Sequence, residues 1–381
     1  MEERHFDSVG RPISLLGFGL MRLPLKSADA KDIDKEAAKR MVDRAIDAGV
    51  NYFDTAWVYH EGMSEVVAGE ALSRHEREKY CLATKMPSWV LESESDVERI
   101  FEEQMKKCSV DYFDFYLMHN LCGERYELAK KYGVYEFLRR KKEEGRIFRL
   151  GFSIHDSPEQ LLEVLDKYDW DFVQLQINYL DWETLDSGRM YELITGRDIP
   201  VIVMEPVRGG ALATLSPDAE KILRDTDPAA STASWAIRYA ASLPGVLTVL
   251  SGMSNSAQLE DNLKTMTNFR PLSDDERSVI ERAATSYRAS GAIPCTACRY
   301  CMDCPSGVDI PRVFAIFNHY RTVAQNSPGI APIVFENNYR TLADGARAGN
   351  CVSCGQCLEH CPQSIDIPAR MREIAEFAAK A

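Results

Sequence analysis

The chain has 381 residues, 45% of them hydrophobic and 27% charged, which is enough for one large globular domain and a small one. The formal net charge of -13 argues against a nucleic-acid partner and against an anionic membrane surface. No stretch has the apolar length of a transmembrane helix, and the start MEERHFDS lacks the apolar core of a signal peptide. We therefore expect a cytoplasmic protein that binds neither membranes nor nucleic acid.

Over the first 285 residues, short apolar runs alternate with amphipathic helical patterns such as EAAKRMVDRAIDAG and PEQLLEVLDKYD. The predicted strands lie at residues 15–19, 51–54, 80–85, 112–119, 147–153, 171–178, 200–205 and 246–251. Eight strands, each followed by a helix, predict a parallel (β/α)8 TIM barrel, a fold of about 250 residues. The alternative is an open doubly wound sheet. We expect the barrel to occupy residues 1–285 and a smaller domain to occupy residues 286–381.

Polar side chains stand where several predicted strands end. Asp54 follows NYF, Lys85 follows YCLAT and His119 follows FYLM, while Tyr59 lies five residues after Asp54. The other strand-end candidates are Ser153, Gln174 and Asn178. In (β/α)8 barrels the active site forms at the rim where the strands end, so we expect these side chains to converge there.

An acid, a phenol, an ammonium and an imidazole on one rim have a chemical use. A free tyrosine has a pKa of about 10, too high for proton exchange at neutral pH. The Lys85 ammonium would favour the phenolate of Tyr59 and lower its pKa, and Asp54 would hold Lys85 in place. His119 would donate to a substrate carbonyl oxygen or share the proton with Tyr59. This arrangement predicts a general acid poised over a carbonyl that receives a hydride.

The same residues carry a family resemblance. The segment FDTAWVYH is similar to the Asp-Thr-Ala-x-x-Tyr signature of the aldo-keto reductases, and Lys85 in ATK and His119 in LMH complete the Asp-Tyr-Lys-His tetrad of that family. LGFGLMR near the start and VLSGMSNSAQLEDN near the last strand also match. The resemblance covers about residues 10–285. It implies a small carbonyl or alcohol substrate, a nicotinamide dinucleotide, and Tyr59 as the proton donor.

The resemblance also implies positions for the dinucleotide. Gln174 stands where the family places a glutamine against the carboxamide, and Ser153 matches the family's serine. Met204 replaces the aromatic residue that stacks on the nicotinamide, and Ile154 replaces an asparagine next to the serine. The remaining positions implied by the resemblance cover the pyrophosphate, with Pro206 and Gly209, and the adenosine, with Ser251, Gly252, Met253 and Asn262.

Two cationic residues with which the family holds the 2′-phosphate of NADPH are replaced by Gly252 and Gln258. A phosphate without cationic partners loses its charge-assisted hydrogen bonds. We therefore expect NAD(P)H binding without a strong preference for NADPH. Because the dinucleotide match is uneven, bound FMN is the alternative.

Eight of the eleven cysteines lie in two runs near the end of the chain, CTACRYCMDCP (295–305) and CVSCGQCLEHCP (351–362). In a cytosolic chain such crowding favours metal binding over disulfides. The second run has the C-x2-C-x2-C-x3-C-P spacing of cluster-binding ferredoxins, and the first has one residue fewer before its last cysteine. A zinc site is the rival interpretation. We interpret the three scattered cysteines as small buried hydrophobic residues: Cys81, Cys108 and Cys122.

The two cysteine runs belong to a repeat, because CPSGVDIP (304–311) is similar to CPQSIDIP (361–368) and each precedes a helical pattern. The pair resembles the α-helical ferredoxin domain of fumarate reductase iron–sulfur subunits and implies two [4Fe-4S] clusters. By the cross-ligation rule of ferredoxins, each cluster takes its fourth ligand from the other run. The predicted ligand sets are Cys295, Cys298, Cys301 and Cys361 for one cluster, and Cys304, Cys351, Cys354 and Cys357 for the other.

Three hypotheses for function follow. The first is an aldo-keto-reductase-like enzyme that reduces a carbonyl, or oxidises the alcohol, and carries a two-cluster ferredoxin-like domain. The second is a flavin-dependent reductase on the same barrel, fed one electron at a time by the clusters and a redox partner protein. The third is a non-catalytic redox or iron sensor, against which the complete tetrad argues.

Overall fold

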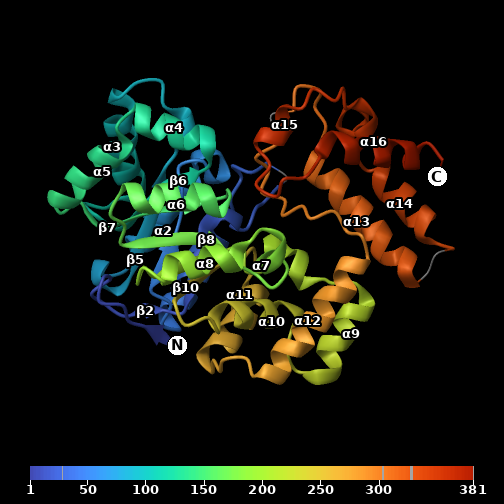
Figure 1. Ribbon diagram of the computed structural model, residues 1–381, viewed down its shortest axis with the longest axis horizontal. Helices are drawn as coiled ribbons and strands as arrows, with labels where there is room; N and C mark the ends of the chain where they lie inside the picture. Colours follow the sequence, from blue (N-terminus) through green and yellow to red (C-terminus); the bar gives the residue numbers. More distant parts are fainter. Residues whose placement is uncertain (28, 303, 327–328, 381) are drawn as a thin grey trace. The chain divides into compact units, whose positions relative to one another are not determined.

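The computed structural model describes residues 1–27, 29–302, 304–326 and 329–380 (Figure 1). Eight parallel strands close into a barrel in the order β10-β3-β4-β5-β6-β7-β8-β9. This confirms the predicted (β/α)8 fold and excludes the open sheet. The barrel strands are β3 (Leu16–Gly19), β4 (Tyr52–Asp54), β5 (Cys81–Met86), β6 (Phe113–Leu121), β7 (Ile147–Ile154), β8 (Phe172–Gln176), β9 (Val201–Met204) and β10 (Val246–Gly252).

Helices follow the strands as the apolar patterns predict. From the first strand to the last, the helices are α1 (Lys35–Asp47), α2 (Ser64–Leu72), α3 (Ser95–Cys108), α4 (Gly123–Lys131), α5 (Val134–Glu143), α6 (Pro158–Lys167), α7 (Asp181–Thr184), α8 (Ser187–Thr195), α9 (Pro217–Thr226), α10 (Thr232–Ala241), α11 (Ser256–Thr267) and α12 (Asp274–Ala289). Side chains cap the first turns of some of these helices. Asp34 accepts from the backbone of Ala37 at the start of α1, for example.

A short hairpin that the sequence analysis did not predict precedes the barrel. Its strands are β1 (Glu3–Arg4) and β2 (Ile13–Ser14). Ser14 exchanges hydrogen bonds with Asn51, which immediately precedes β4, so the hairpin lies at the N-terminal end of the barrel strands. Its apolar side chains share one buried cluster with Phe115 and Phe172 from barrel strands. The hairpin therefore covers one end of the barrel, and the predicted site residues lie at the other end, where the strands finish.

Contacts between Cα atoms divide the chain into two compact units. One contains Met1–Pro206 and Ala236–Leu272, with all the barrel strands. The other contains Val207–Trp235 and Ser273–Ala381, so α9 and α12, which pack against each other, belong to the same unit as the cysteine runs. The domain boundary at residues 285/286 stays a prediction from the sequence.

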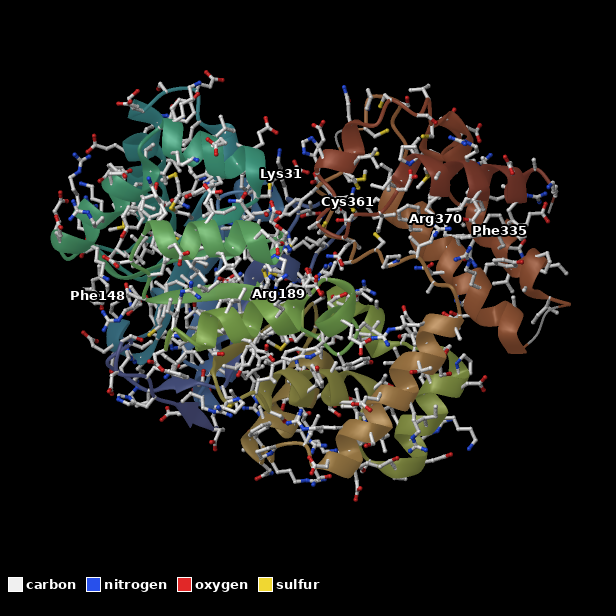
Figure 2. The ribbon with its side chains drawn as sticks, in the orientation of Figure 1. Lys31, Phe148, Arg189, Phe335, Cys361 and Arg370 are labelled. Carbon is white, nitrogen blue, oxygen red and sulfur yellow. The ribbon has the colours of Figure 1, made fainter. Side chains whose placement is uncertain are left out.

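The C-terminal region is small and helical, as predicted. Its helices are α13 (Ile310–Asn326), α14 (Ala331–Tyr339), α15 (Gln356–Glu359) and α16 (Ile367–Ala378). The two DIP segments of the sequence repeat start α13 and α16. Phe335 of α14, labelled in Figure 2, packs edge-on against Phe317 and Phe377 in the core of this region. No helix among the described residues is long and apolar enough to cross a bilayer.

Candidate functional site

Neighbouring barrel strands place the four tetrad residues. Asp54 is the last residue of β4, Lys85 lies near the end of β5, and His119 lies in β6. Tyr59 starts a short 3-10 helix after β4. All four side chains are buried, and Lys85 is fully so. The structure thus brings the predicted tetrad together at the end of three adjacent strands.

Lys85 is the centre of this group. Its Nζ donates to Asp54 Oδ1 at 2.6 Å and to the Thr55 carbonyl oxygen at 2.7 Å. The same Nζ lies 4.8 Å from the centroid of the Tyr59 ring. Burial lowers the pKa of Lys85, and the Asp54 carboxylate opposes that shift by favouring the ammonium. An ammonium that is held beside a phenol can lower the phenol's pKa, as the proposed acid requires.

His119 completes the site as a neutral imidazole. Its ring stands edge-on to Tyr59 with centroids 6.0 Å apart. Burial, followed by the positive charge of Lys85, holds the pKa of His119 well below its usual range. Its Nδ1 is buried and has no hydrogen-bond partner among the described residues. A neutral imidazole here can orient a carbonyl oxygen by a hydrogen bond, while Lys85 supplies the charge.

The structure adds residues that the sequence analysis missed. Behind Lys85, the buried Glu65 carboxylate accepts hydrogen bonds from Thr84 and Gln104, each at 2.6 Å. Gln104 also donates to the backbone oxygen of Lys85 at 3.0 Å, so this network fixes the strand that presents the ammonium. The sequence feature that could have indicated this network is the acidic residue Glu65 at the start of the apolar run EVVAGEAL.

A tryptophan ring also borders the imidazole of His119. The Trp89 ring lies 5.0 Å from the His119 ring, and the Arg125 guanidinium lies 4.2 Å above Trp89. Trp89 is in a 3-10 helix four residues after Lys85. Nothing in its local sequence separates a site tryptophan from a core tryptophan, which is why sequence reasoning passed over it.

The residues predicted to hold the carboxamide of the dinucleotide lie next to one another. Ser153 of β7 is paired in register with Gln174 of β8, and both are buried. Gln174 Nε2 lies 3.6 Å from Met204 Sδ at the end of β9. Its Oε1 is buried without a hydrogen-bond partner among the described residues. A buried acceptor without a partner is costly, and the amide group of a nicotinamide would satisfy it.

The predicted adenosine end has its own internal hydrogen bonds. Asn262 donates to Ser251 Oγ at 2.9 Å, and Gln258 accepts from the backbone of Ser254 at 2.7 Å. Met253 is fully buried, whereas Gly252 is exposed and lies beside the side chain of Arg22. Neither Gly252 nor Gln258 offers a cation.

The loop after β9 was predicted to cover the pyrophosphate. Pro206 is buried and ends one segment of the barrel unit. Gly209 belongs to the second unit, where it contacts the backbone of Thr296 in the first cysteine run. No motif in the sequence predicts this contact.

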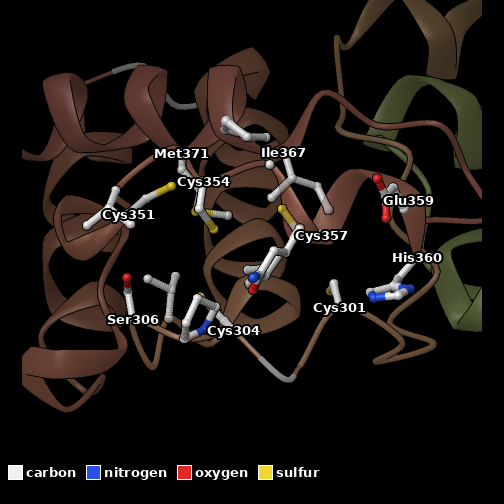
Figure 3. A pocket seen from close by; sticks show the side chains of 17 residues that line it. Cys301, Cys304, Ser306, Cys351, Cys354, Cys357, Glu359, His360, Ile367 and Met371 are labelled. Atoms are coloured by element: carbon white, nitrogen blue, oxygen red, sulfur yellow. The ribbon is translucent and has the colours of Figure 1, made fainter.

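Five cysteines from both runs line one cavity of about 280 Å3 (Figure 3). Four of them, Cys304, Cys351, Cys354 and Cys357, are the set predicted for one cluster, and the fifth is Cys301. Burial, together with the neighbouring Cys351, Cys354 and Cys304, raises the pKa of the Cys357 thiol to about 11. Metal binding would release these protons, because iron binds the thiolates.

The other predicted set lines a second, tighter cavity of about 20 Å3. Its cysteines are Cys295, Cys298, Cys301 and Cys361. Burial, with Cys298, Cys295 and Cys361 as neighbours, raises the pKa of the Cys301 thiol to about 12. Cys361, labelled in Figure 2, therefore lies with the first run although it belongs to the second.

The two cysteine loops share an unusual backbone conformation. The residues two and four positions after Cys295 have left-handed φ angles of 52° (Ala297) and 66° (Arg299). The residues at the same places after Cys351 have φ angles of 55° (Ser353) and 81° (Gly355). Because left-handed φ is uncommon outside glycine, the match is specific. The shorter spacing before Cys304 leaves the three-cysteine loop unchanged.

As they stand, the described cysteine groups do not have the geometry of a zinc site. A zinc ion holds four sulfurs about 2.3 Å from a single point. In the part of the chain that the structure describes, no group of three or more histidine, cysteine, aspartate or glutamate side chains is arranged to hold one metal ion. The thiols instead line cavities and pack against the apolar core of the helical region. Outside these groups, Cys81 and Cys108 are buried, as predicted, while Cys122 is partly exposed.

Comparison with known proteins settles the family. The aldo/keto reductase family model matches residues 15–285. The chain belongs to the aldo/keto reductase family. It differs from a minimal aldo/keto reductase in its C-terminal region, because residues 294–365 match the 4Fe-4S dicluster domain. The resemblance to the aldo-keto reductases and the C-terminal ferredoxin-type 4Fe-4S domain, both inferred from sequence motifs, are confirmed.

Individual relatives cover the barrel. The uncharacterized oxidoreductase YqkF of Bacillus subtilis is 24% identical over 311 residues, which is 74% of this chain and 96% of the relative. The holo form of the aldo-keto reductase AKR11C1 of Bacillus halodurans is 25% identical, with a TM-score of 0.62 over 74% of this chain and 96% of its own. An aldo-keto reductase of Klebsiella pneumoniae in complex with NADPH is 21% identical, with a TM-score of 0.57 over 74% of this chain and 95% of its own.

The buried ion pair of this aldo/keto reductase leads to a prediction about stability. Asp54→Asn leaves the Lys85 ammonium buried without its counter-charge, and breaking such a pair typically costs about 3–5 kcal/mol. We expect the free energy of unfolding, measured by urea denaturation, to fall by that amount.

The control removes both charges. The double variant Asp54→Asn/Lys85→Met should recover most of the loss, because no uncompensated charge remains. A double variant as unstable as Asp54→Asn alone would show that the cost does not come from the buried charge.

Proposed function

We propose that this aldo/keto reductase exchanges a hydride between a nicotinamide dinucleotide and a small carbonyl compound or its alcohol, and that it carries two [4Fe-4S] clusters. The observation that carries the first part is the buried Lys85–Asp54 pair, with Nζ 4.8 Å from the Tyr59 ring centroid. A buried ammonium beside a buried phenol is costly in a purely structural site and useful for general acid catalysis.

A nicotinamide dinucleotide, when bound, would supply or accept the hydride. Tyr59 gives a proton to the carbonyl oxygen during reduction and takes it back during oxidation, since a general acid in one direction is a base in the other. The charge of Lys85 favours the Tyr59 phenolate in this exchange, and Asp54 favours the charged form of Lys85. The neutral His119 orients the carbonyl oxygen by a hydrogen bond. Ser153 and Gln174 would hold the carboxamide, with Met204 beside the ring.

The cluster part of the proposal depends on the two groups of four cysteines, each drawn from both runs. Cys354 is exposed, so the edge of its cluster would be open to a one-electron partner protein. A cytoplasmic location with reduced thiols suits these sites. The flavin-dependent reaction inferred from the sequence stays an alternative, and no contact among the described residues of the site favours it.

The first prediction of this proposal concerns Tyr59 as the general acid. Tyr59→Phe should lower turnover of small aldehydes by about 10²–10⁴-fold, the usual contribution of general acid–base catalysis. Dinucleotide affinity, measured by fluorescence titration, should stay near the wild-type value, since the phenol is proposed to act on the substrate. Tyr132→Phe, which changes a partly exposed tyrosine at the end of α4, is the matched control. Unchanged turnover in Tyr59→Phe would remove this residue from the mechanism.

A second prediction concerns cofactor choice. Because Gly252 and Gln258 provide no cation, NADPH and NADH should bind within roughly tenfold of each other, or about 1.4 kcal/mol. Titration of each dinucleotide under the same salt conditions tests this. A much stronger NADPH affinity that disappears in Arg22→Gln would show that Arg22, whose side chain lies beside Gly252, supplies the missing charge.

The third prediction concerns cross-ligation. Cys361→Ala should remove the cluster of Cys295, Cys298 and Cys301, and Cys304→Ala should remove the cluster of the second run. Each variant should lose about four of about eight irons, with loss of one signal in electron paramagnetic resonance of the reduced protein. Cys122→Ala, outside both groups, should keep all the iron. Full iron in Cys304→Ala would reject the pairing, and zinc without iron in the wild type would reject the clusters.

A further inference from the structure

Strand β6 is irregular directly after His119. Its register with β7 shifts between Met118 and Leu121. Within this shift, Asn120 has a left-handed φ of 51° and is only 4% exposed. Asparagine tolerates a left-handed φ better than most residues with a side chain, but glycine tolerates it better still. The backbone conformation alone therefore does not account for an amide side chain at this position.

The side-chain oxygen of Asn120 is a buried acceptor. Asn120 Oδ1 has no hydrogen-bond partner among the described residues. The backbone N–H of Asn120 donates to Ser153 Oγ at 2.8 Å, so Asn120 lies beside Ser153 on the neighbouring strand. An unpaired buried acceptor is destabilising, and its presence in a folded protein indicates that a bound molecule donates to it.

A second oxygen of the same kind lies on the other side of Ser153. Gln174 Oε1 is buried and also lacks a hydrogen-bond partner within the described part of the chain. Ser153 and Gln174 are paired in register, and the barrel order β6-β7-β8 places Ser153 between Asn120 and Gln174. Ser153 Oγ accepts one hydrogen bond, and its hydroxyl can still donate another. Two buried acceptors thus flank one hydroxyl donor.

This pattern is complementary to a primary carboxamide, which has two N–H donors and one carbonyl acceptor. We propose that Asn120 is a further binding residue for the nicotinamide: Asn120 Oδ1 and Gln174 Oε1 accept the two N–H groups of its carboxamide, and the Ser153 hydroxyl donates to the carbonyl oxygen. Because Asn120 directly follows His119, one short segment of β6 orients both the nicotinamide and the substrate carbonyl. This inference rests on the proposed function.

The test changes the protein and the cofactor separately. Asn120→Gly removes the amide and accepts the left-handed backbone. The 3-acetylpyridine analogue of NAD⁺ carries a methyl group in place of the amide nitrogen, so it keeps the carbonyl and lacks both N–H donors. Dissociation constants for NAD⁺ and for this analogue are measured by isothermal titration calorimetry on the full-length protein purified anaerobically.

The wild type should bind the analogue roughly 5- to 150-fold more weakly than NAD⁺, the range expected for two hydrogen bonds. Asn120→Gly should weaken NAD⁺ binding by roughly 3- to 10-fold and leave the affinity for the analogue within about twofold, because the analogue cannot make the lost bond. A merely structural role would weaken both ligands equally. Asp198→Gly, which changes an exposed left-handed residue with a φ of 57° before β9, is the matched control and should alter neither affinity.

Three results would overturn the inference. They are an equal loss of affinity for both ligands in Asn120→Gly, wild-type affinity for both, and a raised KM for aldehydes with an unchanged affinity ratio, which would place Asn120 against the substrate. Circular dichroism checks the fold, and if Asn120→Gly does not fold, Asn120→Ala removes the same amide and is judged by the same ratio. A wild type that binds neither dinucleotide would reject the proposed function, and this inference with it.

Discussion

The buried ion pair between Lys85 and Asp54 is the interaction on which the barrel's chemistry depends. The two side chains are 0% and 3% exposed, and an ammonium withdrawn from water costs several kcal/mol unless charge and hydrogen bonds compensate. Asp54 and the Thr55 carbonyl supply both, and they can do so only if β4 and β5 are adjacent and in register. The closed barrel enforces that register. The Glu65–Gln104 network behind Lys85 extends the same constraint one layer outward.

The stability of the C-terminal helical region depends on a different factor. It is small, and a small region seldom buries enough apolar surface to be stable without a disulfide or a metal. Its core is built from residues such as Phe314, Phe317 and Met371, and six of the eight cysteines of the two runs pack against that core. Because each cavity draws cysteines from both runs, binding of clusters would tie the two halves of the repeat together and contribute to folding.

A hydride enzyme has no evident need for one-electron carriers, since a nicotinamide moves two electrons at once. The two groups of cysteines offer a physical answer, because clusters bound there would tie the two halves of the C-terminal repeat together whether or not they change their redox state. The exposed Cys354 leaves room for an electron-transfer role as well.

The sequence predicted what depends on local patterns. The eight strands, the order of Asp54, Tyr59, Lys85 and His119, and the helices after the DIP repeat all follow from periodicity, spacing and motif. What it did not predict depends on packing between residues far apart in the chain. The contact between Gly209 and Thr296 is of this kind, since nothing near either residue encodes it. The β1–β2 hairpin was missed because its strands have only two residues each.

The measurement that tests the central claim most directly follows a deuterium atom. NADH deuterated at the transferable position of C4 is mixed with the protein and a panel of small aldehydes, and the alcohol product is examined by mass spectrometry. Direct hydride transfer at the Tyr59 site predicts alcohol that carries the deuterium on the former carbonyl carbon. A flavin intermediate would exchange the deuterium with water, so an unlabelled alcohol, or no alcohol from any aldehyde, would contradict the account.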